Sequence, residues 1–276
     1  MTGSSSRIPV VLSIAGSDSG GGAGIQADLK AFARCGVHGT TAITAITAQN
    51  TVAVVAVEAV SPEMIRAQIR AVAADLGVDA VKIGMVGGTE AIEVVAAALD
   101  ELAPGTPVVL DPVMVAESGG RLLPEKAEQA LRAVLVPRAT VVTPNLAEAR
   151  VLAGAGAGAR PEALVRAVHA LGPVIAVLTG GHRDEATDLF FDGERLVELG
   201  GERYPDGAAH GSGCTHSATL AARLALGDEP LEAARAARAI AAEAVRDGLR
   251  DLGEGPGPVN VLAVGPRSPE CHNQAR

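Results

Sequence analysis

The residues with the clearest chemical potential lie in one short segment, His-Gly-Ser-Gly-Cys-Thr-His, at residues 210–216. An Ala- and Leu-rich stretch that predicts a helix follows at once, so the amides of residues 211–214 would meet at a helix N-terminus, which favours an anion such as a phosphate. We expect a lowered pKa for Cys214 at such a terminus, and a role as base or nucleophile. Two other interpretations stay open: a glycine-rich helix cap with a packed cysteine, and a metal site of His210, Cys214 and His216 that lacks a standard ligand spacing.

Two other phosphate-binding patterns can be tested against the sequence. Gly22-Ala23-Gly24-Ile25-Gln26-Ala27 has the spacing of a dinucleotide-binding turn, which also needs an acidic residue about 20 positions further on. No Asp or Glu lies between Asp28 and Glu58, so an oxidoreductase of that type is disfavoured. A P-loop is excluded because the chain contains no Gly-Lys dipeptide.

Polar or glycine-rich segments follow five of the predicted strands. They are Gly16–Gly24, Lys82–Gly88, Asp111–Gly120, Thr143–Glu148 and Thr179–His182. Strand-like runs alternate with helix-length stretches, which predicts βαβ units and a mostly parallel central sheet covered by helices on both faces. Ligands bind beyond the carboxyl ends of the strands in such sheets. The clustering of all five segments at that edge therefore indicates an enzyme.

The elements that would position these segments can be listed by residue range. We expect strands at 9–15, 37–46, 52–60, 79–83, 107–111, 139–143 and 173–178, and a hairpin of 187–191 and 195–199 around Asp192-Gly193. Helices are predicted at 23–35, 62–76, 88–102, 124–135, 145–153, 161–171, 213–225 and 229–250. The prediction is an α/β fold in a single domain over residues 8–262, with a small β-hairpin flap and disordered tails at 1–7 and 263–276.

The composition narrows the choice of partners. The chain has 276 residues, 48% of them hydrophobic, and its 23 basic and 32 acidic residues give a net charge of −9. It has no Trp, one Tyr and three Phe, so nucleic acid and anionic membranes are disfavoured as main partners. Cys35, Cys214 and Cys271 are widely separated without a CxxC pair, and the polar start at Met1–Arg7 has no apolar signal-peptide core. We therefore expect a soluble, cytoplasmic protein with reduced thiols.

Several segments, in chain order, resemble those of the hydroxymethylpyrimidine/phosphomethylpyrimidine kinases of thiamine biosynthesis, in the ribokinase-like superfamily. The segments are Ile14–Lys30, Thr47–Thr51, Lys82–Met85, Asp111–Met114, Thr143–Glu148, Gly180-Gly181-His182 and Gly211–Cys214. The resemblance spans about residues 8–262 and implies a ribokinase-like fold and a homodimer. It also implies ATP- and Mg²⁺-dependent phosphorylation of 4-amino-5-hydroxymethyl-2-methylpyrimidine, and then of its monophosphate to the diphosphate.

The resemblance further implies individual site residues. The anion hole and the residue beside the substrate hydroxyl would be Gly211, Ser212, Gly213 and Cys214. The pyrimidine pocket would contain Gln49, Gly16, Asp28, Met85 and Val113. ATP and its phosphates would meet Asn145, Thr179 and Gly181, and the magnesium ion would lie near Asp111 and Glu148.

These residue types suit the implied chemistry, although each also has a structural alternative. The amide of Gln49 can answer both the amine and the ring nitrogen of an aminopyrimidine, and a carboxylate can accept from the amine. Phosphoryl transfer depends mainly on positioning, Mg²⁺ and charge stabilisation. The alternatives are a strand-edge amide for Gln49, a first-turn helix carboxylate for Asp28, a core position for Met85, a strand-end cap for Asp111, and a capping box of Asn145 and Glu148.

A few positions depart from the family pattern. Thr179 stands where Lys is common, Ala208-Ala209 where Asn-Thr is usual, and His216 where Leu is common, so the details of the nucleotide loop stay open. One rival is a pyridoxine/pyridoxal kinase, whose substrate is also a hydroxymethyl heteroaromatic; Gln49 favours the aminopyrimidine. A second rival is a non-catalytic, ligand-sensing relative, which the Asn145/Glu148 and Cys214 elements disfavour.

Overall fold

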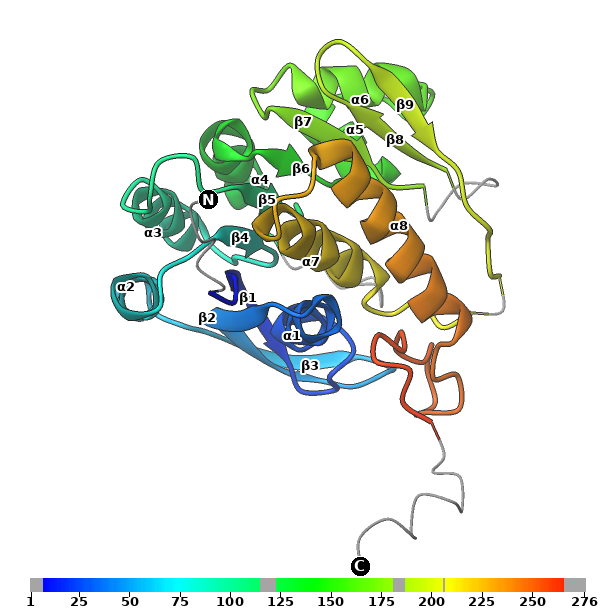
Figure 1. Ribbon diagram of the computed structural model, residues 1–276, viewed down its shortest axis with the longest axis horizontal. Helices are drawn as coiled ribbons and strands as arrows, with labels where there is room; N and C mark the ends of the chain where they lie inside the picture. The colour runs from blue at the N-terminus through cyan, green and yellow to red at the C-terminus, as the bar shows by residue number, and fades with distance from the viewer. Residues whose placement is uncertain (1–6, 115–122, 181–186, 206, 266–276) are drawn as a thin grey trace, which may run out of the picture.

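A single mixed β-sheet runs through the described residues of this computed structural model, 7–114, 123–180, 187–205 and 207–265. Its strands are β1 (Val10–Asp18), β2 (His38–Gln49), β3 (Val54–Ala59), β4 (Ala80–Ile83), β5 (Val108–Leu110), β6 (Val141–Val142), β7 (Ile175–Leu178), β8 (Asp188–Phe191) and β9 (Leu196–Leu199). Their order across the sheet is β3-β2-β1-β4-β5-β6-β7-β8-β9 (Figure 1).

The central strands are parallel and the antiparallel pairs lie at the edges. Strands β2, β1, β4, β5, β6 and β7 run in one direction. At one edge β3 pairs antiparallel with β2, and at the other the β8–β9 hairpin continues antiparallel from β7. All four residues of β4 are buried, as expected for a parallel strand covered on both faces. The predicted mostly parallel sheet with hairpins is confirmed.

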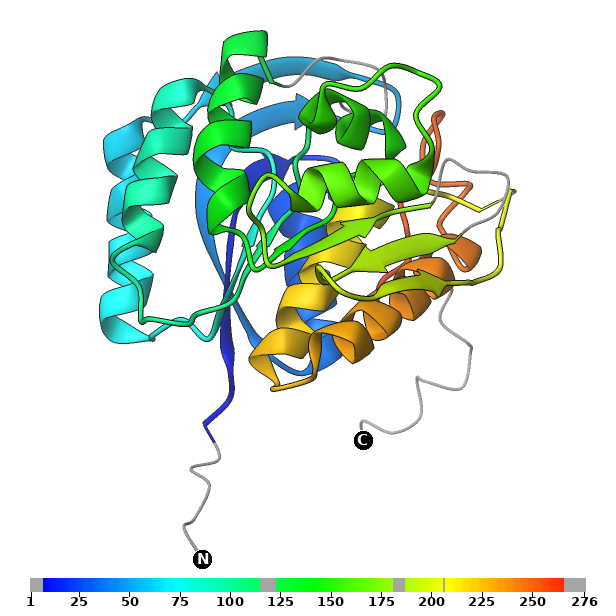
Figure 2. The same ribbon diagram turned by 90° about the horizontal axis from the view of Figure 1, so that it is seen from above.

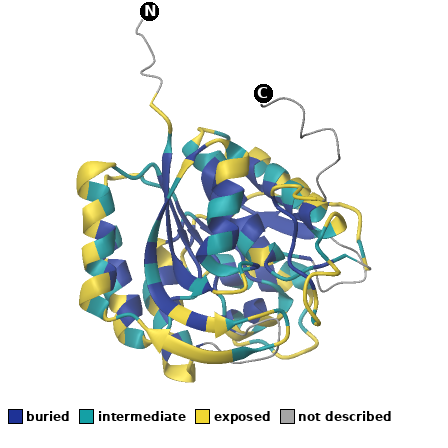
Figure 3. Ribbon diagram, turned by 90° about the horizontal axis from the view of Figure 1, so that it is seen from below, coloured by how far each residue is buried: buried dark blue, intermediate teal, exposed yellow. Residues whose placement is uncertain are grey.

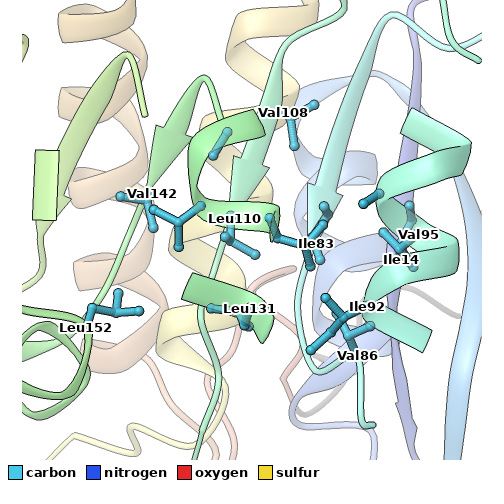
Figure 4. Packing of buried hydrophobic residues seen from close by; sticks show 14 of the residues in the cluster. Ile14, Ile83, Val86, Ile92, Val95, Val108, Leu110, Leu131, Val142 and Leu152 are labelled. Atoms are coloured by element: carbon cyan, nitrogen blue, oxygen red, sulfur yellow. The ribbon is translucent and has the colours of Figure 1, made fainter. Parts of the chain in front are cut away.

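Helices cover both faces of the sheet (Figure 2). One face carries α1 (Gly24–Cys35), α7 (Ser212–Ala225) and α8 (Pro230–Arg246). The other carries α2 (Pro62–Asp75), α3 (Thr89–Leu99), α4 (Glu125–Ala130), α5 (Leu146–Ala153) and α6 (Pro161–His169). Alternate strand residues serve the two cores, with Val11 on the first face and Leu12 and Ile14 on the second. Figure 4 shows the second core, where Ile14, Ile83 and Leu110 pack near Ile92 and Leu131.

The predicted elements are present with shifted bounds, and two helices differ more. The helix expected at 124–135 is α-helical only to Ala130. It then widens into a π-helical turn at Leu131–Leu135 and tightens into a 3₁₀ turn at Val136–Arg138. Pro137 lies in that last turn and has no amide to continue a regular helix. The final helix ends at Arg246 instead of residue 250, because Gly248 packs closely against Ala208 and Leu249 donates to Pro258. The expected tails fall almost wholly outside the described residues.

The strand order predicts a ligand crevice beside β1. The chain proceeds from β1 to β2 on one side, whereas β4 lies on the other side of β1. At such a reversal the connections leave on opposite sides, and a ligand crevice opens at the carboxyl ends of the strands. The segments that follow β1, β4, β5, β6 and β7 share this edge, since these strands are parallel. No helix among the described residues is long and apolar enough to cross a membrane.

Candidate active site

The segment predicted to bind an anion begins α7. Gly211 is the N-cap residue, with φ 89° and ψ 6°, and a Cβ there would come within 1.8 Å of the Gly22 carbonyl oxygen. Only glycine fits this left-handed position. The Ser212 amide donates to the Ala209 carbonyl, which removes it from the expected anion hole. Within the described part of the chain, the amides of Gly213 and Cys214 have no backbone acceptor and can meet an anion.

Cys214 lies in the first turn of α7, with only part of the residue accessible to solvent. The Gly24 amide at the start of α1 lies near its sulfur and lowers the pKa of the thiol. Desolvation nevertheless raises the pKa of the thiol to about 12, and the Lys82 ammonium offsets only part of that rise. The expected lowering of this pKa is wrong, because burial outweighs the helix N-terminus and the nearby cation. Cys214 is therefore a thiol at neutral pH.

Two buried carboxylates lie beside the anion hole. Asp111 follows β5 directly, and its Oδ2 accepts from Ser217 Oγ at 3.0 Å. A Cβ on Gly213 would lie 3.8 Å from the same oxygen, so the start of α7 adjoins this carboxylate. Burial, and to a lesser extent the Asp111 charge, together raise the pKa of Glu148 to about 8. Burial likewise raises the pKa of Asp111. The Lys82 ammonium lowers the pKa of Asp111 by less than burial raises it, so both carboxylates keep raised pKa values.

Glu148 also belongs to a helix cap. Asn145 Oδ1 accepts from the amides of Ala147 at 2.9 Å and Glu148 at 3.0 Å, and Glu148 Oε2 accepts from the Asn145 amide at 2.9 Å. This is the capping box that was left open as an alternative, and it fixes the carboxylate toward Asp111. Thr179 pairs with Asn145 across neighbouring strand ends, and its amide donates to Pro144. The Asn145 and Thr179 segments therefore lie side by side.

The residues expected around a pyrimidine are only partly brought together. A Cβ on Gly16 would lie 2.3 Å from Met85 Cε, so these two residues are in contact. Met85 also borders a hollow of about 210 Å³ with the β2 and β3 residues Ala45 and Val57. Gln49 ends β2 half-buried, and its Oε1 accepts from Thr47 Oγ1 at 3.2 Å.

Two further expected residues need separate comment. Val113 is half-buried, and its amide donates to the Asp111 carbonyl two residues earlier. The structure records no contact between Val113 and the Gly16–Met85 pair in the described residues. Gly181 lies outside the described residues, as does His182.

Asp28 lies in the interior of the protein. Its side chain is fully buried in the second turn of α1, where Ser13 Oγ donates to Oδ2 at 2.6 Å and Lys82 Nζ lies 2.9 Å from both oxygens. The side chain is 0% exposed, so neither oxygen is accessible to a ligand in this structure, and the assignment of Asp28 to the pyrimidine pocket stays a prediction. The first-turn carboxylate alternative is wrong, since the residue points inward from the second turn.

Lys82 is a buried charged residue beside the candidate site to which the sequence analysis gave no role. Its side chain is 0% exposed on β4, between the core and the crevice. Burial lowers the pKa of its ammonium, but Asp28, Cys214 and Asp111 together raise it above the usual value, so the lysine stays charged. Burial raises the pKa of Asp28, yet the two-oxygen contact with a charged lysine fits an ionised carboxylate. The available signal was a lone Lys inside the apolar run at residues 80–83.

The alternative of a metal site from His210, Cys214 and His216 receives no support. His210 Nε2 lies 3.2 Å from Asp18 Oδ2, whereas His216 Nε2 lies 3.2 Å from Asp188 Oδ2. The two imidazoles thus meet different carboxylates. No cluster of three or more His, Cys, Asp or Glu suited to a metal occurs in the part of the chain that the structure describes.

The chain is similar to several known kinases. The family profile described as phosphomethylpyrimidine kinase matches residues 18–260. A hydroxymethylpyrimidine/phosphomethylpyrimidine kinase of Rhizobium meliloti is 51% identical over 257 residues, which cover 91% of this chain and 96% of that protein. An ADP complex of Bacillus subtilis pyridoxal kinase has a TM-score of 0.85 and 38% identity, covering 93% and 98% of the two chains. Phosphomethylpyrimidine kinase from Clostridium difficile 630 has a TM-score of 0.76 and 38% identity, covering 87% and 100%.

The buried ion pair leads to a stability prediction. Lys82→Met should lower the free energy of unfolding by about 3–5 kcal/mol near neutral pH, because it leaves the Asp28 carboxylate buried without its cation. The folded-state pKa of Asp28 would then exceed the unfolded value, so the loss should shrink as the pH falls toward the unfolded pKa and grow as the pH rises. Urea unfolding at acidic and neutral pH measures this.

The neutral pair Lys82→Met/Asp28→Asn should recover much of that loss, since no charge is then left uncompensated. Lys30→Met, which removes a partly buried lysine of α1 that donates to the Gly21 carbonyl, serves as the control. Equal stability of the single and double variants would contradict the ion pair.

Proposed function

We infer that the chain is an ATP-dependent kinase of 4-amino-5-hydroxymethyl-2-methylpyrimidine and of its monophosphate in thiamine biosynthesis, because it belongs to the phosphomethylpyrimidine kinase family. The observation that carries this inference is the meeting of three features at one edge of the sheet. The amides that begin α7 adjoin the buried Asp111 carboxylate, and the contact between Gly16 and Met85 lies at the same edge. An anion hole, a pair of acids and an apolar wall suit phosphoryl transfer to a small aromatic alcohol.

We propose that the transferred phosphoryl group lies against the amides of Gly213 and Cys214, supported by the left-handed Gly211. These donors are fixed by the helix before substrate arrives, so they stabilise developing negative charge without reorganising. Ser212 contributes through its place in the turn, since its amide is already used. The acceptor hydroxyl would lie beside Cys214.

The residues present fit a magnesium ion. Mg²⁺ binds proteins through one or two carboxylates and otherwise keeps water and substrate phosphates as ligands. Asp111 and Glu148 supply two buried carboxylates with raised pKa values, which a divalent cation would lower. When bound, the ion would neutralise charge on the phosphates. Asn145 and Thr179, held side by side, would face those phosphates from the neighbouring strand ends, and Gly181 is proposed for the same role.

A second substrate class has specific support. The Bacillus subtilis relative with a TM-score of 0.85 is a pyridoxal kinase, so pyridoxine or pyridoxal remains the alternative acceptor. Gln49 favours the aminopyrimidine, because one amide can pair with both the amine and the ring nitrogen. The deciding experiment incubates the protein with ATP, Mg²⁺ and a panel of the pyrimidine, its monophosphate, pyridoxine and pyridoxal, and follows products by mass spectrometry. We expect the diphosphate to form from the pyrimidine, and a preference for pyridoxal would overturn the main assignment.

We also propose how the protein is organised in the cell. Residues 8–262 would act as one kinase domain, since strands from Val10 to Leu199 share one sheet.

The edge strand β3 is exposed over most of its length, with Val55 76% and Val57 52% exposed, and we assign this surface to a second copy of the chain (Figure 3). Sedimentation analysis of the protein tests the dimer.

A cytoplasmic location suits an enzyme that uses ATP and carries the free thiols Cys35 and Cys214.

The role of Gln49 can be tested by Gln49→Leu. This change should raise the KM for the pyrimidine by roughly 10–1000-fold and leave the KM for ATP nearly unchanged, because the polar edge of the bound ring loses its partner. Steady-state kinetics with each substrate varied in turn measure both values. An unaltered pyrimidine KM would show that Gln49 is only a strand-edge amide.

Glu148 should couple magnesium binding to pH. Below its raised pKa of about 8, the ion must displace a proton, so the apparent Mg²⁺ affinity should rise by up to about tenfold per pH unit and level off above that pKa. Glu148→Gln should require more Mg²⁺, lower kcat and flatten this dependence. Activity titrated with Mg²⁺ across the pH range measures the effect.

The same variant separates the metal role from the cap. Glutamine can still accept from the Asn145 amide, so the unfolding free energy of the metal-free variant should stay within about 1 kcal/mol of the wild type at pH values below the usual glutamate pKa of 4.5. As the pH rises from there to about 8 the variant should become increasingly the more stable, since an acid whose folded-state pKa is raised ionises first in the unfolded chain. A collapse in stability with unchanged magnesium dependence would leave only the capping role.

Cys214 should distinguish the two phosphorylations. The first nucleophile is an alcohol that must lose its proton, whereas the second is a phosphate oxygen already ionised at neutral pH, with a pKa near 6. Because the pKa of the Cys214 thiol is about 12, the thiolate fraction grows tenfold per pH unit below that value. The first rate should therefore rise with pH between about 7 and 9, while the second stays flat.

Cys214→Ala should remove that slope and reduce the first rate far more than the second. Cys214→Asp should restore part of the first rate, because a carboxylate is a base at neutral pH. Single-turnover rates of both steps test these expectations. Equal losses in the Ala variant would mean that Cys214 shapes the anion hole and moves no proton.

A further inference from the structure

One carboxylate outside the site described so far gathers an unusual number of donors. Asp18 ends β1 and is 3% exposed. Its Oδ1 accepts from the Gly20 amide at 2.8 Å, and its Oδ2 accepts from the amides of Gly22 at 3.0 Å and Ala23 at 2.8 Å. His210 Nε2 lies 3.2 Å from the same Oδ2. Burial raises the pKa of Asp18, but these hydrogen bonds together outweigh that effect, so the pKa is lowered.

The donors come from two loops that are far apart in sequence. Residues 18–24, here called the acceptor loop, connect β1 to α1, and the Gly24 amide at their end lies near the Cys214 sulfur. Residues 210–214, here called the phosphate loop, begin α7. The Asp18–His210 contact therefore bridges the loop beside the proposed alcohol and the loop that would hold the phosphoryl group.

The two loops also touch through their backbones. A Cβ on Gly211 would lie 1.8 Å from the Gly22 carbonyl oxygen, and a Cβ on Gly22 would lie 2.3 Å from His210 Cδ2. Neither position can carry a larger residue without moving one loop away from the other. The Asp18–His210 hydrogen bond and the Gly22–Gly211 backbone contact therefore both set the distance between the two loops.

Each loop has other bonds that keep its own shape. In the acceptor loop, the Gly21 amide donates to the Asp18 carbonyl and Lys30 Nζ donates to the Gly21 carbonyl at 2.6 Å. In the phosphate loop, the Ser212 amide donates to the Ala209 carbonyl, and the His210 carbonyl accepts from Val259 at 3.0 Å. The Asp18–His210 contact is therefore not needed to fold either loop, and what it adds is their relative position.

We propose that Asp18 and His210 are positioning residues that hold the acceptor loop and the phosphate loop at the separation required for phosphoryl transfer. The inference rests on the proposed function for its kinetic consequences and on the apo geometry for its structural ones. Phosphoryl transfer needs the attacking oxygen and the phosphorus in line and close together, and a misplacement of about 1 Å can cost on the order of 100-fold in rate. Both phosphorylations use the same two loops, so both should depend on the Asp18–His210 contact.

The kinetic test compares His210→Leu with two other variants. His210→Leu should lower kcat for both steps by roughly 10–100-fold and change the KM for ATP and for the pyrimidine by less than about threefold. His210→Gln, whose side-chain amide can donate to Asp18, should recover most of the loss. Lys30→Met is the matched control, because it removes a bond to the acceptor loop that does not cross to the phosphate loop. That variant should stay within about threefold of the wild type.

This pattern differs from a loss of folding and from the effect of Cys214. A structural role alone would lower kcat in proportion to the folded fraction, and His210→Gln would give no specific rescue. An effect on the first step only would place His210 in proton transfer with Cys214. Either result, or equal kcat values for His210→Leu and Lys30→Met, overturns the proposal.

A second readout does not depend on any substrate. Amide hydrogen exchange of the ligand-free protein, resolved to peptides, should accelerate in both residues 18–24 and 209–214 in His210→Leu and in Asp18→Asn. In Lys30→Met, acceleration should be confined to residues 18–24. If the wild type phosphorylates none of the tested substrates, the proposed function fails, while this exchange pattern still tests the positioning role of Asp18 and His210. Unchanged exchange in residues 209–214 of both His210→Leu and Asp18→Asn would contradict that role.

Discussion

The ion pair between Lys82 and Asp28 joins three elements on which the site is built. Lys82 belongs to β4 and Asp28 to α1, and Ser13 of β1 donates to the same carboxylate. Either charge alone would cost several kcal/mol in this buried position, so each requires the other. The pair fixes α1 against β1 and β4 at the point where the strand order reverses. The loop between β1 and α1 therefore starts and ends on a rigid base.

The acidic groups near this ion pair are not fully compensated by positive charge. This explains the raised pKa values of Asp111, Glu148 and Cys214 together. Asp111 and Glu148 have raised pKa values because burial and their mutual repulsion disfavour ionisation. The Cys214 thiol remains protonated for the same reason, since one lysine cannot offset the desolvation. A metal ion bound with the nucleotide would supply the missing positive charge. With its pKa of about 8, Glu148 is thus largely protonated at neutral pH in the absence of ligand, and the proposed magnesium complex would favour the ionised carboxylate.

Close backbone contacts complete the geometry. Gly211 meets the Gly22 carbonyl, and a Cβ on Gly24 would lie 2.3 Å from the Gly16 carbonyl oxygen. Loops that approach this closely can place amides toward one small ligand from several directions. Asp18 gathers three of the acceptor-loop amides and the His210 imidazole, so a single carboxylate organises much of this arrangement. Rigid glycine loops of this kind favour a pre-formed anion hole over one that assembles around the substrate.

The sequence alone determined the fold class, and it predicts the edge of the sheet that would carry the site and an anion-binding turn at Gly211–Cys214. Those features depend on local signals: strand–helix alternation, polar segments after strands, and glycines where no Cβ fits. The capping box of Asn145 and Glu148 was also visible, because its partners are three residues apart. Such short-range patterns do not depend on how distant segments pack.

Only the tertiary structure decided the charge states and the partners of buried polar residues. The sequence suggested a pocket role for Asp28 and a lowered pKa for Cys214, and it assigned no role to Lys82 or Asp18. Asp28 and Lys82 are 54 positions apart, and Asp18 and His210 are 192 apart, so no local spacing reveals these pairs. A pKa depends on the balance of desolvation, neighbouring charges and hydrogen bonds, all of which exist only after the chain has folded.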